Sequence, residues 1–203
     1  GAQLAVISTD AVFAGPQFFH SEDSPPTSPS PLAAAARQIE EVLLDAGVLI
    51  VRTHAYGWAP PGVEAGYAET MWQALSDGTK PAIDPYRHAS PILAADLAEL
   101  LWLALRRKLS GIWHLAGAER VSQYRFAVEM AAAMGFGDTW IAGEDPAEDR
   151  LPAGEETSLD CRRAARELRR PMPMLAEGLR RFVFQATSGY RRRLGAPARI
   201  DAA

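Results

Sequence analysis

The stretch that most constrains this chain is residues 4–15, where the apolar run Leu4–Ile7 leads directly into Ser8, Thr9 and Asp10. An unbroken apolar run is typical of a buried strand in a parallel sheet. Ligands of open α/β sheets bind beyond the carboxyl ends of the strands. We therefore expect Ser8, Thr9 and Asp10 to lie beside a binding site, although the same residue types also cap turns where no ligand binds.

A helix and a second strand follow. Ser30 suits the N-cap, Pro31 suits the first turn, and Gly47 is a typical C-terminal stop. Apolar residues recur at helical spacing on one face, and charged residues such as Glu40 fall largely on the other. The apolar face comprises Leu32, Ala35, Ala36, Ile39, Val42 and Leu43. The run 48–51 predicts the next strand, so residues 1–58 predict one right-handed strand–helix–strand unit of a parallel sheet.

The remaining chain predicts further helices and one clear strand, followed by a tail. The expected helices cover 67–77, 94–108, 122–134, 158–169 and 172–184, and the strand covers 112–115. Residues 138–156 are acidic and predict a solvated loop with a short strand near 140–141, because their spacing matches no calcium-binding loop. Residues 188–203, which include Arg191 to Arg193, predict a frayed tail.

Composition excludes several classes of protein. The formal net charge of −4 disfavours nucleic acid and anionic membranes as partners. A single cysteine, Cys161, excludes an internal disulfide and fits the reducing cytoplasm. No apolar run approaches the about 20 residues that cross a bilayer. We expect a cytoplasmic α/β protein with no metal site.

The chain carries an ordered set of motifs in segments 8–15, 21–26, 30–32, 51–53, 88–91, 95–98, 111–117, 158–160 and 177–179. In this order and at this spacing, they resemble the dTDP-4-dehydrorhamnose reductase family, which are extended short-chain dehydrogenases acting on nucleotide sugars. The resemblance implies the C-terminal part of a Rossmann-like fold, with residues 59–187 forming a mixed α/β substrate-binding portion. The chain contains no Gly-x-x-Gly-x-x-Gly turn, so it lacks the dinucleotide-binding half.

The resemblance also exposes a changed reaction centre. The family's helix carries a Tyr and, four residues later, a Lys that together move a proton during hydride transfer. Alignment on Pro31-Leu32 places Ala35 and Ile39 at these positions, and the helix contains neither Tyr nor Lys. Thr9 matches the third catalytic residue and alone is retained. The simpler alternative for Thr9 is a strand-end hydroxyl bonded to backbone.

The candidate substrate-binding residues lie after the strands. The family's Trp two positions after Thr53 is Ala55 here, although His54 and Tyr56 remain as aromatic candidates. Such residues more often pack a loop than line a pocket. The resemblance and the strand-end rule together nominate Asp10, Phe13, His54, Tyr56, Ser90 and Pro91.

Two functions compete. The first is a non-catalytic relative that acts as a nucleotide-sugar-binding, regulatory or interaction subunit and binds no cofactor on its own. The second is an active NADP- or NAD-dependent reductase of a dTDP-4-keto sugar, whose dinucleotide-binding half lies outside this chain and whose proton donor is another residue, such as His20 or Tyr56. In either case, we expect a missing N-terminal half or another subunit to cover the sheet edge and the Ala35/Ile39 face.

Overall fold

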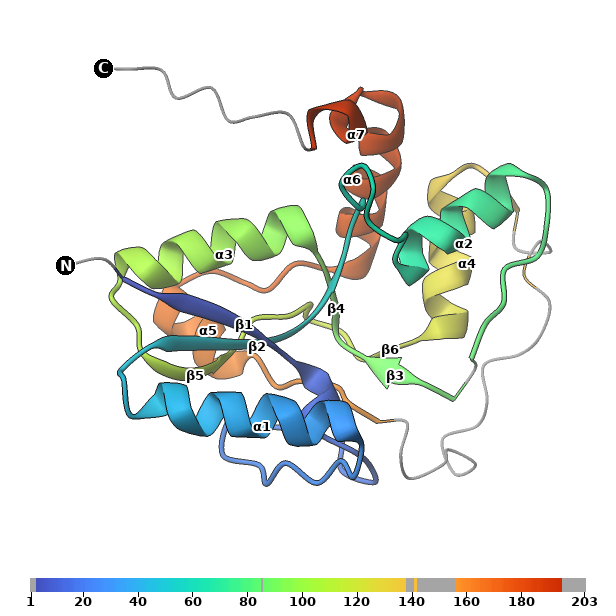
Figure 1. The fold of residues 1–203 in the computed structure, drawn as a ribbon. Coiled ribbons are helices and arrows are strands. Elements are labelled where there is room, and N and C mark those ends of the chain that lie inside the picture. Colours follow the sequence, from blue (N-terminus) through green and yellow to red (C-terminus); the bar gives the residue numbers. More distant parts are fainter. Residues whose placement is uncertain (1–2, 85, 138–140, 142–155, 195–203) are drawn as a thin grey trace, which may run out of the picture.

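The computed structural model has a parallel sheet at its centre (Figure 1). Strand β2 (Leu49–Tyr56) pairs with β1 (Ala5–Thr9) on one side. Its other side is shared by β5 (Gly111–His114) and β4 (Pro91–Leu93), and all three pairings are parallel. The predicted α/β class is therefore confirmed. The structure describes residues 3–84, 86–137, 141 and 156–194.

Helices cover both faces of this sheet. In Figure 1, α1 (Pro31–Leu44) lies below the strands and α3 (Ala94–Arg106) lies above them. As predicted, Ser30 caps α1 by accepting a hydrogen bond from the backbone N–H of Ala33. Helix α5 (Arg162–Leu168) packs against α3 and β5 and completes the first hydrophobic core.

A second core lies beyond the carboxyl ends of β2 and β4. Trp58 and Phe182 stack within it at 4.2 Å between ring centroids. The elements around this core lie to the right of the sheet and above its right end in Figure 1. They are α2 (Tyr67–Ser76), α4 (Gln123–Ala133), α6 (Leu175–Thr187) and the antiparallel pair β3 (His88–Ala89) and β6 (Val121–Ser122).

Two local predictions were wrong. The helix expected from 158 begins only at Arg162, because the preceding residues form inter-segment backbone bonds: Thr157 donates to His88 and Ser158 accepts from His20. The first part of the tail expected over 188–203 is not frayed: it forms α7 (Tyr190–Arg193), and an ion pair between Arg191 and Glu69 ties it to α2. The acidic loop and its strand lie mostly outside the described residues. The division at residue 58 stays a prediction, although one sheet takes strands from both sides of it.

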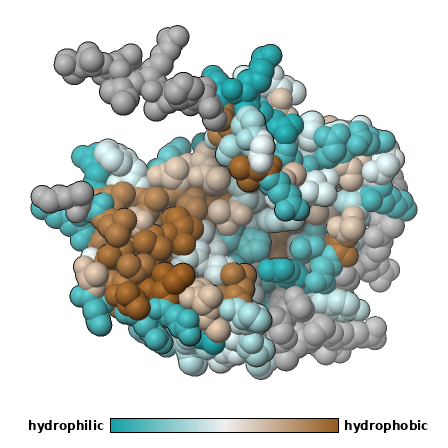
Figure 2. All heavy atoms as spheres, in the orientation of Figure 1, coloured by the Kyte–Doolittle hydropathy of each residue, from teal (hydrophilic) through white to brown (hydrophobic). Residues whose placement is uncertain are grey.

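The orientation of α1 also differs from the prediction. Glu40, assigned to the solvent side, is buried, whereas Leu32, Ile39 and Val42 on the apolar stripe are 63%, 55% and 74% exposed. The reason is a buried ion pair between Glu40 and Arg52 of β2, which turns this side of the helix toward the sheet. The apolar stripe points past β1, and Figure 2 shows a hydrophobic surface over α1 and β1.

Neither a bilayer-spanning helix nor a group of three potential metal ligands occurs among the described residues.

Candidate functional site

Thr9 and Asp10 stand where β1 ends, as the strand-end rule predicts. A single turn of 3-10 helix, η1 (Asp10–Val12), starts there with Thr9 as its N-cap. The Thr9 hydroxyl accepts from the backbone N–H of Ala11 at 3.1 Å and donates to Asp10 Oδ1 at 3.3 Å. Thr9 therefore has the local bonding of a strand-end hydroxyl bonded to backbone, which was the simpler alternative to a catalytic role.

An apolar hollow of about 320 Å³ lies on one side of Thr9, between β1 and α1. Both residues at the family's Tyr and Lys positions line it: Ala35 and Ile39. Leu32 and Ala36 lie on the same wall, so a shifted alignment of the helix brings no proton-transferring group into the hollow. Among the α1 residues that line the hollow, Glu40 is the acidic side chain that could supply a proton.

Glu40 lines this hollow but is fully engaged. Its Oε1 accepts from Ser8 at 2.5 Å and from Arg52 Nε at 2.9 Å, and its Oε2 accepts from Arg52 Nη2 at 2.6 Å. Two parallel bonds of this kind give a rigid, charge-neutral pair. Glu40 thus acts in the structure as the anchor of α1 on the sheet.

A polar cluster lies on the other side, around the buried Asp10 carboxylate. Its Oδ2 accepts from Thr157 Oγ1 at 2.5 Å and lies 2.9 Å from His54 Nδ1. Burial alone would raise the pKa of Asp10, but the charge and hydrogen bond of His54, the bond from Thr157 and the charge of Arg87 together hold that pKa below its usual value. Asp10 is therefore an acceptor, so His54 Nδ1 carries the hydrogen.

A small hollow of about 20 Å³, the polar hollow, opens beside this cluster and has room for about one water molecule. His54 and Tyr67 line it with their rings 5.6 Å apart, and the loop before β3 and the start of α4 supply Arg87 and Gln123. Burial, with the charges of Tyr56 and Asp10, raises the pKa of Tyr67 well above its usual value, so its phenol stays protonated.

The structure brings together some of the predicted substrate-binding residues. Asp10 and His54 meet directly, and Pro91 pairs with His54 across β2 and β4 and lines the polar hollow. The other three lie elsewhere. Phe13 stacks on His20 in the first core, Tyr56 packs in the second core, and the buried Ser90 accepts from Leu159 N–H.

The replacement proton donors suggested from sequence, His20 and Tyr56, line neither hollow. Burial lowers the pKa of His20 and raises that of Tyr56, so both rings stay neutral. Sequence reasoning missed Tyr67, Arg87 and Thr157. The sequence feature that came nearest to indicating Thr157 was the family segment 158–160, which directly follows it.

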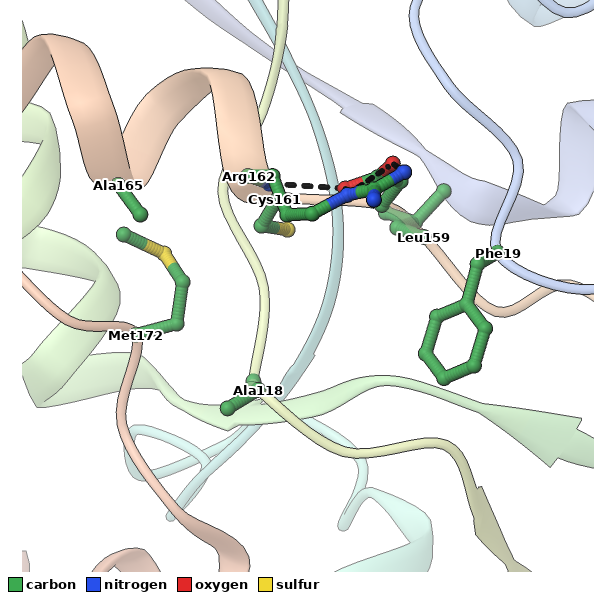
Figure 3. A pocket seen from close by; sticks show the side chains of 9 residues that line it. Phe19, Ala118, Leu159, Cys161, Arg162, Ala165 and Met172 are labelled. Carbon is green, nitrogen blue, oxygen red and sulfur yellow. Dashed lines mark hydrogen bonds and ion pairs between the residues drawn. The ribbon is translucent and has the colours of Figure 1, made fainter.

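A larger pocket of about 460 Å³ lies between the loop that contains Phe19 and the start of α5 (Figure 3). Asp160 and Arg162 at its edge pair with each other at 2.5 Å. Burial raises the pKa of the Cys161 thiol to about 12, so this cysteine is no nucleophile at neutral pH. The rest of the lining is mostly apolar, and the pocket offers no group for acid–base chemistry.

Solved structures of known proteins share this fold. A hypothetical dTDP-4-dehydrorhamnose reductase from Sulfolobus tokodaii is 24% identical, with a TM-score of 0.69 over 87% of this chain and 63% of that one. The dTDP-4-dehydrorhamnose reductase of Bacillus anthracis in complex with NADP is 21% identical, with a TM-score of 0.72 over 91% and 66%. A UDP-N-acetylglucosamine 4-epimerase from Bacillus cereus is 15% identical, with a TM-score of 0.68 over 90% and 64%. This chain thus spans just under two thirds of these proteins.

No curated protein matches the chain. The family model described as the RmlD substrate binding domain matches residues 1–188, almost the whole chain. This match confirms the family predicted from the motifs, and the structural matches confirm the Rossmann-like fold. The chain belongs to the RmlD substrate binding domain family.

Proposed function

We propose that this chain is a non-catalytic relative of dTDP-4-dehydrorhamnose reductase that binds a nucleotide sugar without reducing it. The observation that carries the proposal is the wall of the apolar hollow opposite Thr9, where α1 presents Leu32, Ala35, Ala36 and Ile39. Reducing a ketone requires a proton at the carbonyl oxygen as hydride reaches the carbon. General acid catalysis of this kind contributes typically about 10²–10⁴-fold.

Thr9 cannot supply that proton by itself. A threonine hydroxyl is a very weak acid, and the Thr9 hydrogen already points to Asp10 Oδ1. Glu40, the acidic side chain on the same wall, is held by Arg52 and Ser8. Thr9 can still position a ligand oxygen, which is a binding role.

The polar hollow supports retained ligand binding. Asp10, His54 and Arg87 place an anion, an imidazole and a cation near one another at the strand ends, where α/β folds bind ligands. The names of the related structures mention dTDP- and UDP-sugar enzymes, so a nucleotide sugar is the ligand class we propose.

The nicotinamide cofactor of the related enzymes does not fit this chain on its own. Among the described residues, no lysine or arginine lines the apolar hollow, so it offers no positive charge for a pyrophosphate. We expect no measurable binding of NADPH or NADH to the isolated chain, and calorimetry with both tests this. A complete reductase would require NADP or NAD to be held largely by another segment.

We further propose that an α/β segment of another polypeptide, or of a longer form of this one, covers β1. The outer edge of β1 has no strand partner among the described residues, and its sequence, Ala5 to Thr9, carries no charge that would protect it. About a third of each related chain lies outside the part that this chain matches. A regulatory or interaction subunit would use this face.

The decisive experiment measures reduction and binding side by side. NADPH absorbance is followed with a dTDP-4-keto sugar, and dTDP-glucose binding is measured by calorimetry. We expect binding without turnover, and at best a weak gain from Ala35→Tyr combined with Ile39→Lys. Robust turnover that disappears in Thr9→Val would instead establish the competing function, an active reductase with another proton donor.

A further inference from the structure

We propose that the polar hollow binds one hydroxyl group of the ligand's sugar, and that His54, oriented by Asp10, is the residue that recognises it. The inference rests on the proposed nucleotide-sugar binding and assigns a specific role within it.

The orientation of His54 is fixed from one side. Its Nδ1 faces Asp10 Oδ2 at 2.9 Å, and Asp10 in turn is held by Thr157. An ionised carboxylate can only accept, so the imidazole donates through Nδ1 and its Nε2 is left to face a ligand. No hydrogen bond to Nε2 is formed by the described residues, although the ring lines the hollow and its side chain is 18% exposed.

The hollow has the size of a hydroxyl site, and polar side chains stand among the apolar ones that line it. Its volume of about 20 Å³ suits a single oxygen atom and excludes a sugar ring, so the ring would lie across its mouth. Tyr67 supplies a protonated phenol, and Arg87 supplies a cation that has no carboxylate within 4.0 Å among the described residues. A hydroxyl matches this lining because it can both donate and accept, so it can pair with His54 Nε2 and also accept from Arg87 or Tyr67.

Other groups fit the same lining poorly. A methyl group would leave Nε2 of His54 and the donors of Arg87 unpaired, and unpaired buried polar groups carry a large energetic cost. An ammonium group would meet the positive charge of Arg87. Sites built to hydrogen-bond a substrate hydroxyl reject analogues that lack it far more strongly than apolar pockets reject a missing methylene.

Two substitutions of His54 separate recognition from structure. In His54→Asn, the amide can keep the bond to Asp10 but places nothing at the Nε2 position. In His54→Gln, the longer side chain can return a polar group to that position. We expect His54→Asn to weaken dTDP-glucose binding about tenfold, the loss of roughly one hydrogen bond, and His54→Gln to recover part of it.

The control ligand is dTDP, which lacks the sugar. Its affinity should be the same in both variants, because His54 would contact only the sugar, and melting temperatures confirm that each variant is folded. Glu41→Gln, on the exposed side of α1, serves as the unaffected variant. Two results would overturn this inference but leave the proposed function standing. In one, the wild type binds dTDP-glucose no more tightly than dTDP; in the other, His54→Asn weakens the binding of both ligands equally. Binding of neither ligand by the wild type would overturn the proposed function as well.

Discussion

The two hollows beside Thr9 and Asp10 share a sheet edge but differ in chemistry. Beside the apolar hollow, the Glu40 carboxylate is held by hydrogen bonds from Ser8 and Arg52. In the polar hollow, Asp10 fixes one nitrogen of His54 and leaves the other toward open space. The family's fold persists on both sides, yet only the second side keeps groups available for a ligand. A shared fold does not by itself secure a shared activity, and in this chain the chemistry of the two hollows differs across one strand end.

The largest expected effect comes from breaking the closed network of the apolar hollow. Glu40→Ala would leave the buried Arg52 guanidinium without its counter-charge, and removing one partner of a buried ion pair typically costs about 3–5 kcal/mol. Urea unfolding measures this loss. Glu41→Ala, the exposed neighbour on α1, should change stability by less than about 0.5 kcal/mol. A similar small change for both variants would show that the pair does not anchor α1.

Low pH should reduce the stability of the fold through a histidine next to Arg52. His114 is the β5 neighbour of Arg52, and burial, with the charge of Arg52, lowers its pKa to about 4. The unfolded chain takes up a proton near pH 6.5, whereas the folded chain resists it until about pH 4. The contribution of His114 to the free energy of unfolding is therefore fully present above pH 6.5. It is lost as the pH falls toward 4, and the loss is about 3 kcal/mol. The pKa of His20 is lowered in the same direction.

Unfolding at a series of pH values tests this dependence. In His114→Gln, the slope between pH 6.5 and pH 4 should become shallower, whatever the substitution does to stability at pH 7. The lowered pKa values of Asp10 and Asp160 act at lower pH, because unfolded aspartate titrates near pH 3.8. An unchanged slope in His114→Gln would mean that another group takes up the proton.

The sequence predicted what local signals encode. Ser30 caps its helix as expected, and the apolar runs became parallel strands. It could not predict the inward turn of Glu40, because that depends on Arg52, a residue of another element. The polar cluster was still less visible, since Thr157 and Asp10 are 147 positions apart. Helical periodicity reports which residues share a face, and tertiary partners decide which face is buried.

Opening the polar cluster should cost less than opening the Glu40–Arg52 pair. Asp10→Ala removes the acceptor of both Thr157 and His54, but His54 can turn toward water. We expect a loss of about 1–3 kcal/mol, below that of Glu40→Ala, together with loss of dTDP-glucose binding. Thr157→Val, which removes one hydrogen bond, should lose about 1 kcal/mol. If Asp10→Ala proved the more destabilising variant in urea, the polar cluster would be the main anchor of this sheet end.

The smallest effect is expected at Ile39, on the uncovered face of α1. Because Ile39 is 55% exposed, Ile39→Lys should change the unfolding free energy of the isolated chain by less than about 0.5 kcal/mol. Leu100→Ala, in the first core, should cost about 2–5 kcal/mol and calibrates the assay. If another segment covers this face in an assembly, burying an isoleucine contributes about 1.5–3 kcal/mol there, and Ile39→Lys should dissociate that assembly. Light scattering after size exclusion, at several concentrations, distinguishes the two situations. A large loss of stability in a strictly monomeric chain would mean that the face is already packed, and the case for a covering partner would be lost.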